Sequence, residues 1–186
     1  MATVLVTTAN GDTGRPMVDR LIEEGLHVRA MVRTDDERAQ RLRDKGAQVV
    51  FGSLLDFREV RAALAGVQRA YFNYPVGEGL VEAAVMFAQA AREQDLDLVV
   101  NMSHIQSRPE ARSKATQNHW LSEQVFNWSG VPATHLRKGF FMQWLLYISG
   151  ADPLRPLRHA LRRRQSLRAD RRKRHCPDRG QDLHST

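Results

Sequence analysis

Short runs rich in β-branched residues alternate with helical segments through most of the chain, and this alternation constrains the fold more than any other feature. Strands are expected at residues 3–7, 27–32, 48–51, 69–73, 97–102 and 133–137, and helices at residues 13–24, 35–45, 56–64, 79–94 and 114–128. Strands separated by helices of this length form right-handed βαβ units and a parallel sheet. The sequence therefore predicts an α/β fold, a doubly wound parallel sheet of six strands with helices on both faces.

The net charge of +7 is confined to the end of the chain. Residues 151–186 hold 11 Lys and Arg against four Asp, whereas residues 1–150 hold 17 residues of each sign. Only nine of the last 36 residues are hydrophobic, and none of them is Val, Ile, Met, Phe, Trp or Tyr, so a buried strand or helix is not expected there. We therefore predict a folded domain at residues 1–150 and an Arg-rich, disordered tail at residues 151–186.

Several classes of protein are excluded by composition. The single cysteine, Cys176, rules out a disulfide scaffold and an all-cysteine metal site, and no metal ligand set is predicted. The first residues lack the basic region of a signal peptide, and no apolar run approaches the roughly 20 residues that a membrane span needs. We expect a cytoplasmic protein without a membrane partner.

The first expected strand runs into a glycine-rich turn and then directly into a helix. Gly11 and Gly14 lie at Gly-x-x-Gly spacing in this turn, together with Thr7, Asp12 and Thr13. Glycines here allow the backbone to approach a pyrophosphate, whose charge is bound by free N–H groups at the helix N-terminus. The turn predicts a dinucleotide site at these five residues, and a plain turn with a helix cap is the alternative.

The residue after the second strand decides which dinucleotide is favoured. Arg33 follows that strand about 20 residues after the glycines, and a guanidinium offers paired donors to the 2′-phosphate of NADP. Asp35 and Asp36 lie close behind and could accept hydrogen bonds from the ribose of NAD. We predict NADP as the cofactor, and NAD stays open.

Residues at the carboxyl ends of the later strands are expected to face the same crevice. Ser53 and Leu54 follow the third strand and are predicted near the adenine. Asn73, Tyr74 and Pro75 follow the fourth strand and are predicted along the middle of the cofactor. A loop residue without ligand contact is the alternative at each position.

Residues 2–148 resemble the NmrA-like atypical short-chain dehydrogenase/reductase family, which has a Rossmann fold. The resemblance rests on Thr-Thr-Ala-Asn-Gly-Asp-Thr-Gly at 7–14, Gly-Ser-Leu-Leu-Asp at 52–56, Asn-His-Trp-Leu-Ser-Glu at 118–123 and Ser-Gly-Val-Pro-Ala-Thr-His-Leu-Arg at 129–137. The family's opening turn usually reads Thr-Gly-Ala-x-Gly-x-x-Gly. Thr8 stands where the first glycine is expected, which is a departure at the point of closest pyrophosphate approach.

The Tyr-x-x-x-Lys motif of typical short-chain dehydrogenases is absent, because no lysine follows any tyrosine at that spacing. His119 and Glu123 lie four residues apart on the corresponding helix, so they share one face and could relay a proton. Ser103, after the fifth strand, occupies the place of the catalytic serine of the typical enzymes. These three residues are the predicted catalytic group, with a surface or structural His–Glu pair as the alternative.

The resemblance implies an NAD(P)H-dependent oxidoreductase of the quinone or carbonyl reductase class, acting on a small-molecule substrate. Family members also include non-catalytic NADP-binding redox sensors, which is the alternative. The C-terminal part that forms the family's substrate pocket is not recognisable after residue 150, so this chain is expected to be truncated and impaired in turnover. A frameshift, a basic tail that binds nucleic acid and an amphipathic helix are the explanations of residues 151–186. The oligomeric state is not indicated.

Overall fold

The computed structural model describes residues 2–75 and 77–139. The predicted tail and the last residues of the predicted domain lie outside this part of the chain. Within it, none of the helices is long and apolar enough to cross a bilayer.

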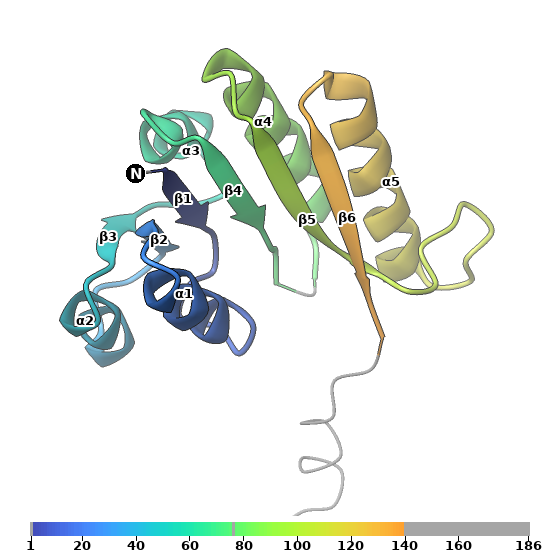
Figure 1. Cartoon of the computed structure of the whole chain (residues 1–186). Coiled ribbons are helices and arrows are strands. Elements are labelled where there is room, and N and C mark those ends of the chain that lie inside the picture. Colours follow the sequence, from blue (N-terminus) through green and yellow to red (C-terminus); the bar gives the residue numbers. More distant parts are fainter. Residues whose placement is uncertain (1, 76, 140–186) are drawn as a thin grey trace, which may run out of the picture. The chain divides into compact units, whose positions relative to one another are not determined.

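Six parallel strands form one sheet with the order β3-β2-β1-β4-β5-β6 (Figure 1). The strands are β1 (Thr3–Val6), β2 (His27–Val32), β3 (Gln48–Phe51), β4 (Arg69–Phe72), β5 (Leu98–His104) and β6 (Ala133–Lys138). The helices are α1 (Gly14–Glu23), α2 (Glu37–Asp44), α3 (Phe57–Leu64), α4 (Leu80–Glu93) and α5 (Lys114–Ser129). The predicted Rossmann-like fold, with six strands and helices on both faces, is confirmed.

The fifth strand is longer than predicted. It was expected to end at residue 102, but β5 continues through Ser103 and His104. The reason is strand pairing, because β6 lies alongside these residues with Ser103 opposite Arg137 and His104 opposite Lys138. Ser103 is therefore a strand residue held in a sheet, not a loop residue as predicted.

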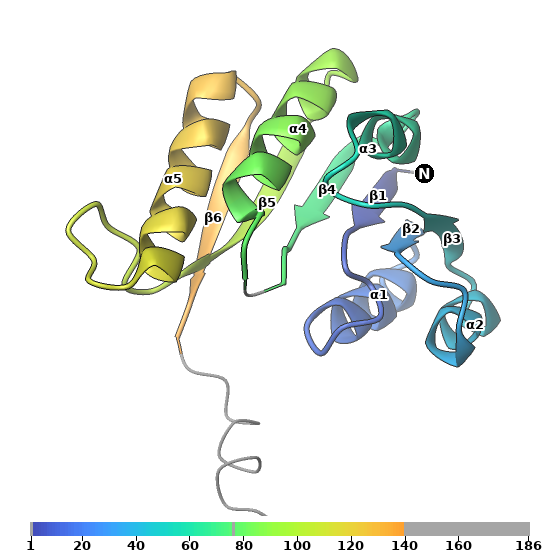
Figure 2. The same ribbon diagram turned by 180° about the vertical axis from the view of Figure 1, so that it is seen from behind.

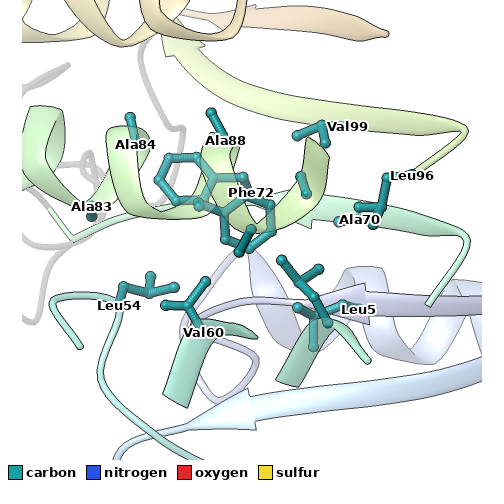
Figure 3. Packing of buried hydrophobic residues seen from close by; sticks show 14 of the residues in the cluster. Leu5, Leu54, Val60, Ala70, Phe72, Ala83, Ala84, Ala88, Leu96 and Val99 are labelled. Carbon is teal, nitrogen blue, oxygen red and sulfur yellow. The ribbon is translucent and has the colours of Figure 1, made fainter. Parts of the chain in front are cut away.

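Two apolar cores lie on opposite faces of the sheet. The smaller core joins β1 and β2 to α1 and α2, and the larger joins the central strands to α3, α4 and α5 (Figure 2). In the larger core the rings of Phe72, Phe87 and Phe126 lie 4.8 to 6.4 Å apart, at separations where aromatic pairs contribute about 0.5–1.5 kcal/mol beyond their burial. Ala84 and Ala88 on α4 lie beside Phe72, and their small side chains leave room for its ring (Figure 3).

The strand order fixes the location of the ligand crevice. β1 lies at the middle of the sheet between β2 and β4, so successive crossovers leave it in opposite directions. In sheets of this kind ligands bind outside the carboxyl ends of the strands where the order reverses. The loops after β1 and β4 meet at that point.

Candidate functional site

The turn between β1 and α1 is packed too closely for side chains at its second glycine. A Cβ atom on Gly14 would lie 2.4 Å from the carbonyl oxygen of Thr8 and 2.7 Å from Cα of Ala9, both backbone atoms. A Cβ atom on Gly11 would lie 3.2 Å from the same oxygen, which is tight but adjustable. Gly14 therefore allows the first turn of α1 to approach the end of β1, the role of the glycine that permits close helix–strand packing in dinucleotide-binding folds.

Thr8, where the family places a glycine, adopts a left-handed backbone conformation with φ of +48°. This conformation is unfavourable for a β-branched residue and costs about 1–2 kcal/mol. Two hydrogen bonds hold it: Asn73 Nδ2 donates to Thr8 Oγ1 at 3.0 Å, and Thr8 Oγ1 donates to the Asn73 carbonyl oxygen at 3.4 Å. The turn thus keeps the backbone shape of the glycine it lacks.

Asn73 joins the β4 end to the glycine-rich turn. Its Nδ2 also donates to Thr13 Oγ1 at 2.9 Å, while its backbone N–H donates to Thr7 Oγ1 at 2.8 Å and its carbonyl oxygen accepts from the same hydroxyl at 2.8 Å. Thr7, Thr13 and Asn73 are therefore brought together, and the hydrogen bonds that the structure gives their side chains run among themselves and their neighbours.

The helix that starts at this turn has no side-chain cap. Asp36 and Asp56 cap α2 and α3 by accepting hydrogen bonds from two backbone N–H groups each, but Thr13 makes no such bond at the start of α1. No acidic residue lies in the first turn of α1 either. The amide groups and the positive end of the dipole of α1 are therefore suited to an anion.

A cavity of about 580 Å³ opens at the carboxyl ends of β1, β2 and β3. It falls within the range of small-molecule and cofactor sites. Of the predicted cofactor residues, those that line it are Gly11, Arg33, Ser53, Leu54, Tyr74 and Pro75. Those that do not line it are Thr7, Asp12, Thr13, Gly14 and Asn73, which build the turn beside it. Thr8, Asn10 and Arg38 also line it and were not predicted as contacts.

The charges around the cavity separate Arg33 from its acidic neighbours. Arg33 is exposed and has no ion pair with any residue that the structure describes. Asp35 pairs with Arg43 at 2.9 Å. Asp36 caps α2 and bonds the guanidinium of Arg38 at 2.7 Å, and hydrogen bonding to Arg38, then to the α2 backbone, holds the pKa of Asp36 below its usual value. Neither Asp lines the cavity, whereas both Arg33 and Arg38 do.

The predicted catalytic residues lie at the opposite edge of the sheet, between β5, β6 and α5. Ser103 Oγ donates to Glu123 Oε1 at 2.5 Å, and Arg137 donates from Nε to Oε1 at 2.9 Å and from Nη2 to Oε2 at 2.6 Å. Glu123 is 1% exposed. Burial acts to raise the pKa of Glu123, but the hydrogen bonds from Arg137 and Ser103 and the charge of the guanidinium outweigh it, so this pKa is lowered.

His119 lies one turn before Glu123 on α5 and makes no hydrogen bond to it in the described part of the chain. Its Nδ1 atom is buried and has no hydrogen-bond partner there, and its ring stacks on His104 with centroids 6.0 Å apart. Burial, followed by the charges of Lys138 and His104, lowers the pKa of His119 to about 4. His119 is therefore neutral at neutral pH, with a polar atom free for a ligand.

Two arginines at the candidate site were not among the residues predicted from the sequence. Arg137 belongs to the Ser-Gly-x-x-x-Thr-x-Leu-Arg segment, but nothing in that segment indicates a partner on α5. Arg38 lies five residues after Arg33, and its spacing from a strand end was the available signal. The pairing of Arg137 with Glu123 becomes visible only when the register of β6 and the packing of α5 are known.

Comparison with known proteins places the chain among NAD(P)H-binding proteins. The chain is 31% identical over 150 residues to an NAD(P)H azoreductase of Xenophilus azovorans, covering 80% of this chain and 51% of that protein. Its fold is similar to that of the Escherichia coli NADPH-dependent quinone oxidoreductase QOR2 solved with NADPH, with a TM-score of 0.70 at 20% identity over 80% of this chain and 53% of that one.

A Citrobacter sp. triphenylmethane reductase solved with NADP(H) has a TM-score of 0.67 at 21% identity, over 76% of this chain and 51% of that one. The chain spans about half the length of the azoreductase and of these two solved proteins. The model of the NAD(P)H-binding family matches residues 8–144, which include the glycine-rich turn, the cavity and the Ser103–Glu123–Arg137 group, and the chain belongs to this family.

Proposed function

We propose that this chain is the cofactor-binding part of an NADPH-dependent reductase of the NmrA-like short-chain dehydrogenase type, with a quinone or carbonyl compound as the small-molecule acceptor. The observation that carries the choice of NADPH is that Arg33 lines the cavity without an ion pair to any described residue, while the two following aspartates are bonded to Arg43 and Arg38. A 2′-phosphate would form an ion pair with Arg33. A ribose 2′-hydroxyl would need a carboxylate acceptor, and both nearby aspartates are already paired with arginines. The azoreductase and quinone reductase relatives support the reaction class.

The residues that would bind the phosphates of the cofactor and those near the reacting atoms lie toward opposite edges of the sheet. The turn at Gly11 and Gly14 and the uncapped start of α1 bind the pyrophosphate, and Arg33 binds the 2′-phosphate. Bound NADPH supplies the hydride, so the protein's task at the reacting end is positioning. There, neutral His119 offers its open Nδ1 position to a ligand, and Ser103 lies at the end of β5.

Cofactor titration of the full chain tests the first half of the proposal. Isothermal titration with NADPH and NADH should give tighter binding of NADPH, and Arg33→Ala should weaken NADPH about 10- to 100-fold while leaving NADH unchanged, as expected for a charged hydrogen bond. Arg41→Ala is the matched control, because Arg41 is exposed on α2 and does not line the cavity. Tighter NADH binding in the parent protein would refute the assignment.

Oxidation of NADPH in the presence of a panel of quinones, aldehydes and an azo dye tests the second half. Loss of reduced-nicotinamide absorbance with one acceptor class identifies a reductase and its substrate. The second candidate function is a redox sensor that binds NADP without turnover, and the absence of Tyr-x-x-x-Lys favours it. Tight NADPH binding with no oxidation by any acceptor would decide for the sensor.

A further inference from the structure

Glu123 is a buried carboxylate whose two oxygens are both occupied by donors. Arg137 binds both oxygens with two parallel N–H···O bonds, and Ser103 adds a third bond to Oε1. The Arg137 side chain is 51% exposed, so the guanidinium bridges from solvent to the buried carboxylate. A bidentate ion pair of this kind is among the strongest and most directional contacts available to a carboxylate.

These bonds determine which atom carries each proton. A guanidinium can only donate, so the two oxygens of Glu123 must accept, and the carboxylate has to be ionised to accept three bonds in this arrangement. The Ser103 hydroxyl then has its single proton committed to Oε1. The hydroxyl is left with acceptor lone pairs alone.

The surroundings of Glu123 reinforce the ionised state. His135 on β6 also acts to lower its pKa, and on the same helix His119 lies close enough for Glu123 to act on the pKa of that imidazole. His119, however, has no hydrogen bond to Glu123 among the described residues. A proton relay from His119 to Glu123 therefore lacks its connection.

We infer that Arg137 is a positioning residue that keeps Glu123 ionised and thereby fixes Ser103 as a hydrogen-bond acceptor at the end of β5. The inference rests on the proposed function for what Ser103 contacts. Ser103 is fully buried, so its hydroxyl serves the Glu123–Arg137 group, and any group that approached its remaining lone pairs would have to be a donor, that is, a hydroxyl or an N–H. Glu123 has no proton to transfer in this arrangement, which gives it a different role from the predicted relay.

The experiment uses the full chain with Arg137→Met and Arg137→Lys, and Arg61→Met as the matched control. Arg61 pairs with Glu93 at 3.2 Å, but Glu93 is partly exposed to solvent. This variant therefore removes an Arg–Glu pair without leaving a buried carboxylate unpaired. Carboxyl NMR of isotope-labelled Glu, assigned with Glu123→Gln, follows the titration of Glu123. The hydroxyl proton of Ser103, held in a short bond to a carboxylate, should give a strongly downfield signal that Ser103→Ala removes.

In Arg137→Met the titration midpoint of Glu123 should rise by about two pH units, because a neighbouring opposite charge is lost, and the downfield signal should vanish once Glu123 is protonated. Arg137→Lys should keep the signal with a smaller rise. Should Arg137→Met fail to fold, the Lys variant and Glu123→Gln still decide. An unmoved midpoint in Arg137→Met, or a downfield signal that persists in Glu123→Gln, would overturn the inference.

Reductase kinetics supply a second readout. Once an acceptor is identified, kcat of Arg137→Met should fall below that of the parent protein as the pH is lowered and recover as the pH is raised and the carboxylate re-forms, while Arg61→Met stays parallel to the parent protein at every pH. A merely structural role predicts the same loss at every pH. If the parent protein oxidises no NADPH, the proposed reductase function fails, but the NMR signals still test the role of Arg137.

Discussion

Replacing Gly14 by Ala tests whether close packing of α1 against the turn holds the cofactor site together. The added Cβ would lie 2.4 Å from the Thr8 carbonyl oxygen and 2.7 Å from Ala9 Cα, and neither backbone atom can rotate away. Helix α1 must therefore move outward, at a cost of about 3 kcal/mol, the upper part of the usual range for overpacking. For a chain of this size the melting temperature should fall by about 6–12 °C.

Whether Gly14→Ala lowers or raises the melting temperature distinguishes a steric clash at the turn from the higher helix propensity of alanine. Gly14 is the first residue of α1, and an alanine there would stabilise the helix by up to about 1 kcal/mol if nothing opposed it. Gly11→Ala is the graded control, because its Cβ would meet the same carbonyl oxygen at 3.2 Å and should cost less than about 1 kcal/mol. Thermal melts and NADPH titrations of both variants measure the effect. A Gly14→Ala protein that melts with or above the parent protein would refute the packing argument.

Three further changes probe the two ends of the site. Thr8→Gly removes about 1–2 kcal/mol of left-handed strain, but it also removes the two hydrogen bonds of the Thr8 hydroxyl and makes the unfolded chain more flexible. The unfolding free energy should therefore stay within about 1 kcal/mol of the parent value while NADPH binds several-fold tighter; weaker binding would show that the hydroxyl takes part in the site. Arg38→Ala should weaken NADPH less than Arg33→Ala, since Arg38 must first leave Asp36; equal losses in calorimetry would contradict this order. Because the pKa of His119 falls from 6.5 to about 4 on folding, the unfolded chain binds the extra proton, and the unfolding free energy should drop by up to about 3 kcal/mol as the pH falls from about 6.5 to 4. Denaturant melts of His119→Gln should show a shallower drop, and an unchanged slope would refute the assignment.

The fold followed from hydrophobic patterning because each element buries a face that the sequence marks. Four apolar residues of α1 whose spacing puts them on one helix face, Met17, Val18, Leu21 and Ile22, all contribute to the core on the α1 side. The bounds of β5 were missed at the carboxyl end, since Ser103 and His104 carry no strand signal of their own. Their extended conformation comes from pairing with β6, a contact across about 30 residues that local patterning does not encode.

The nucleotide end of the site was more readable than the reacting end for a physical reason. The glycine-rich turn and Arg33 were predicted from backbone shape and from position after a strand, and both are local properties of the sequence. The pairing of Glu123 with Arg137 depends on how α5 packs against the sheet. The sequence offered His119 as the partner of Glu123 because the two residues share a helix face, but Arg137 lies opposite Ser103 in the neighbouring strand and is better placed.

Beside the apolar contacts of Phe126, α5 makes two similar polar contacts with the sheet. Asn101 and His135 are register partners on β5 and β6, and His135 is also bonded to Asn127 on α5 at 3.0 Å. Two residues further along the strands, and one turn earlier on α5, Ser103, Arg137 and Glu123 form the next such group.

The two polar groups bear on the register of β6 against β5. Because successive strand residues point to opposite faces, a slip of β6 by one residue would remove both partners from α5 at once, so the two polar groups specify the register of β6 more strongly than its half-exposed apolar residues do. His119 lies one further turn along α5, at the carboxyl end of the sheet, where the same pattern leaves its Nδ1 atom buried and without a partner in the described chain. A buried polar atom without a partner is costly unless something binds it. The arrangement that aligns the strands therefore ends, near the carboxyl end of β5, in a buried ring nitrogen that has no hydrogen-bond partner among the described residues.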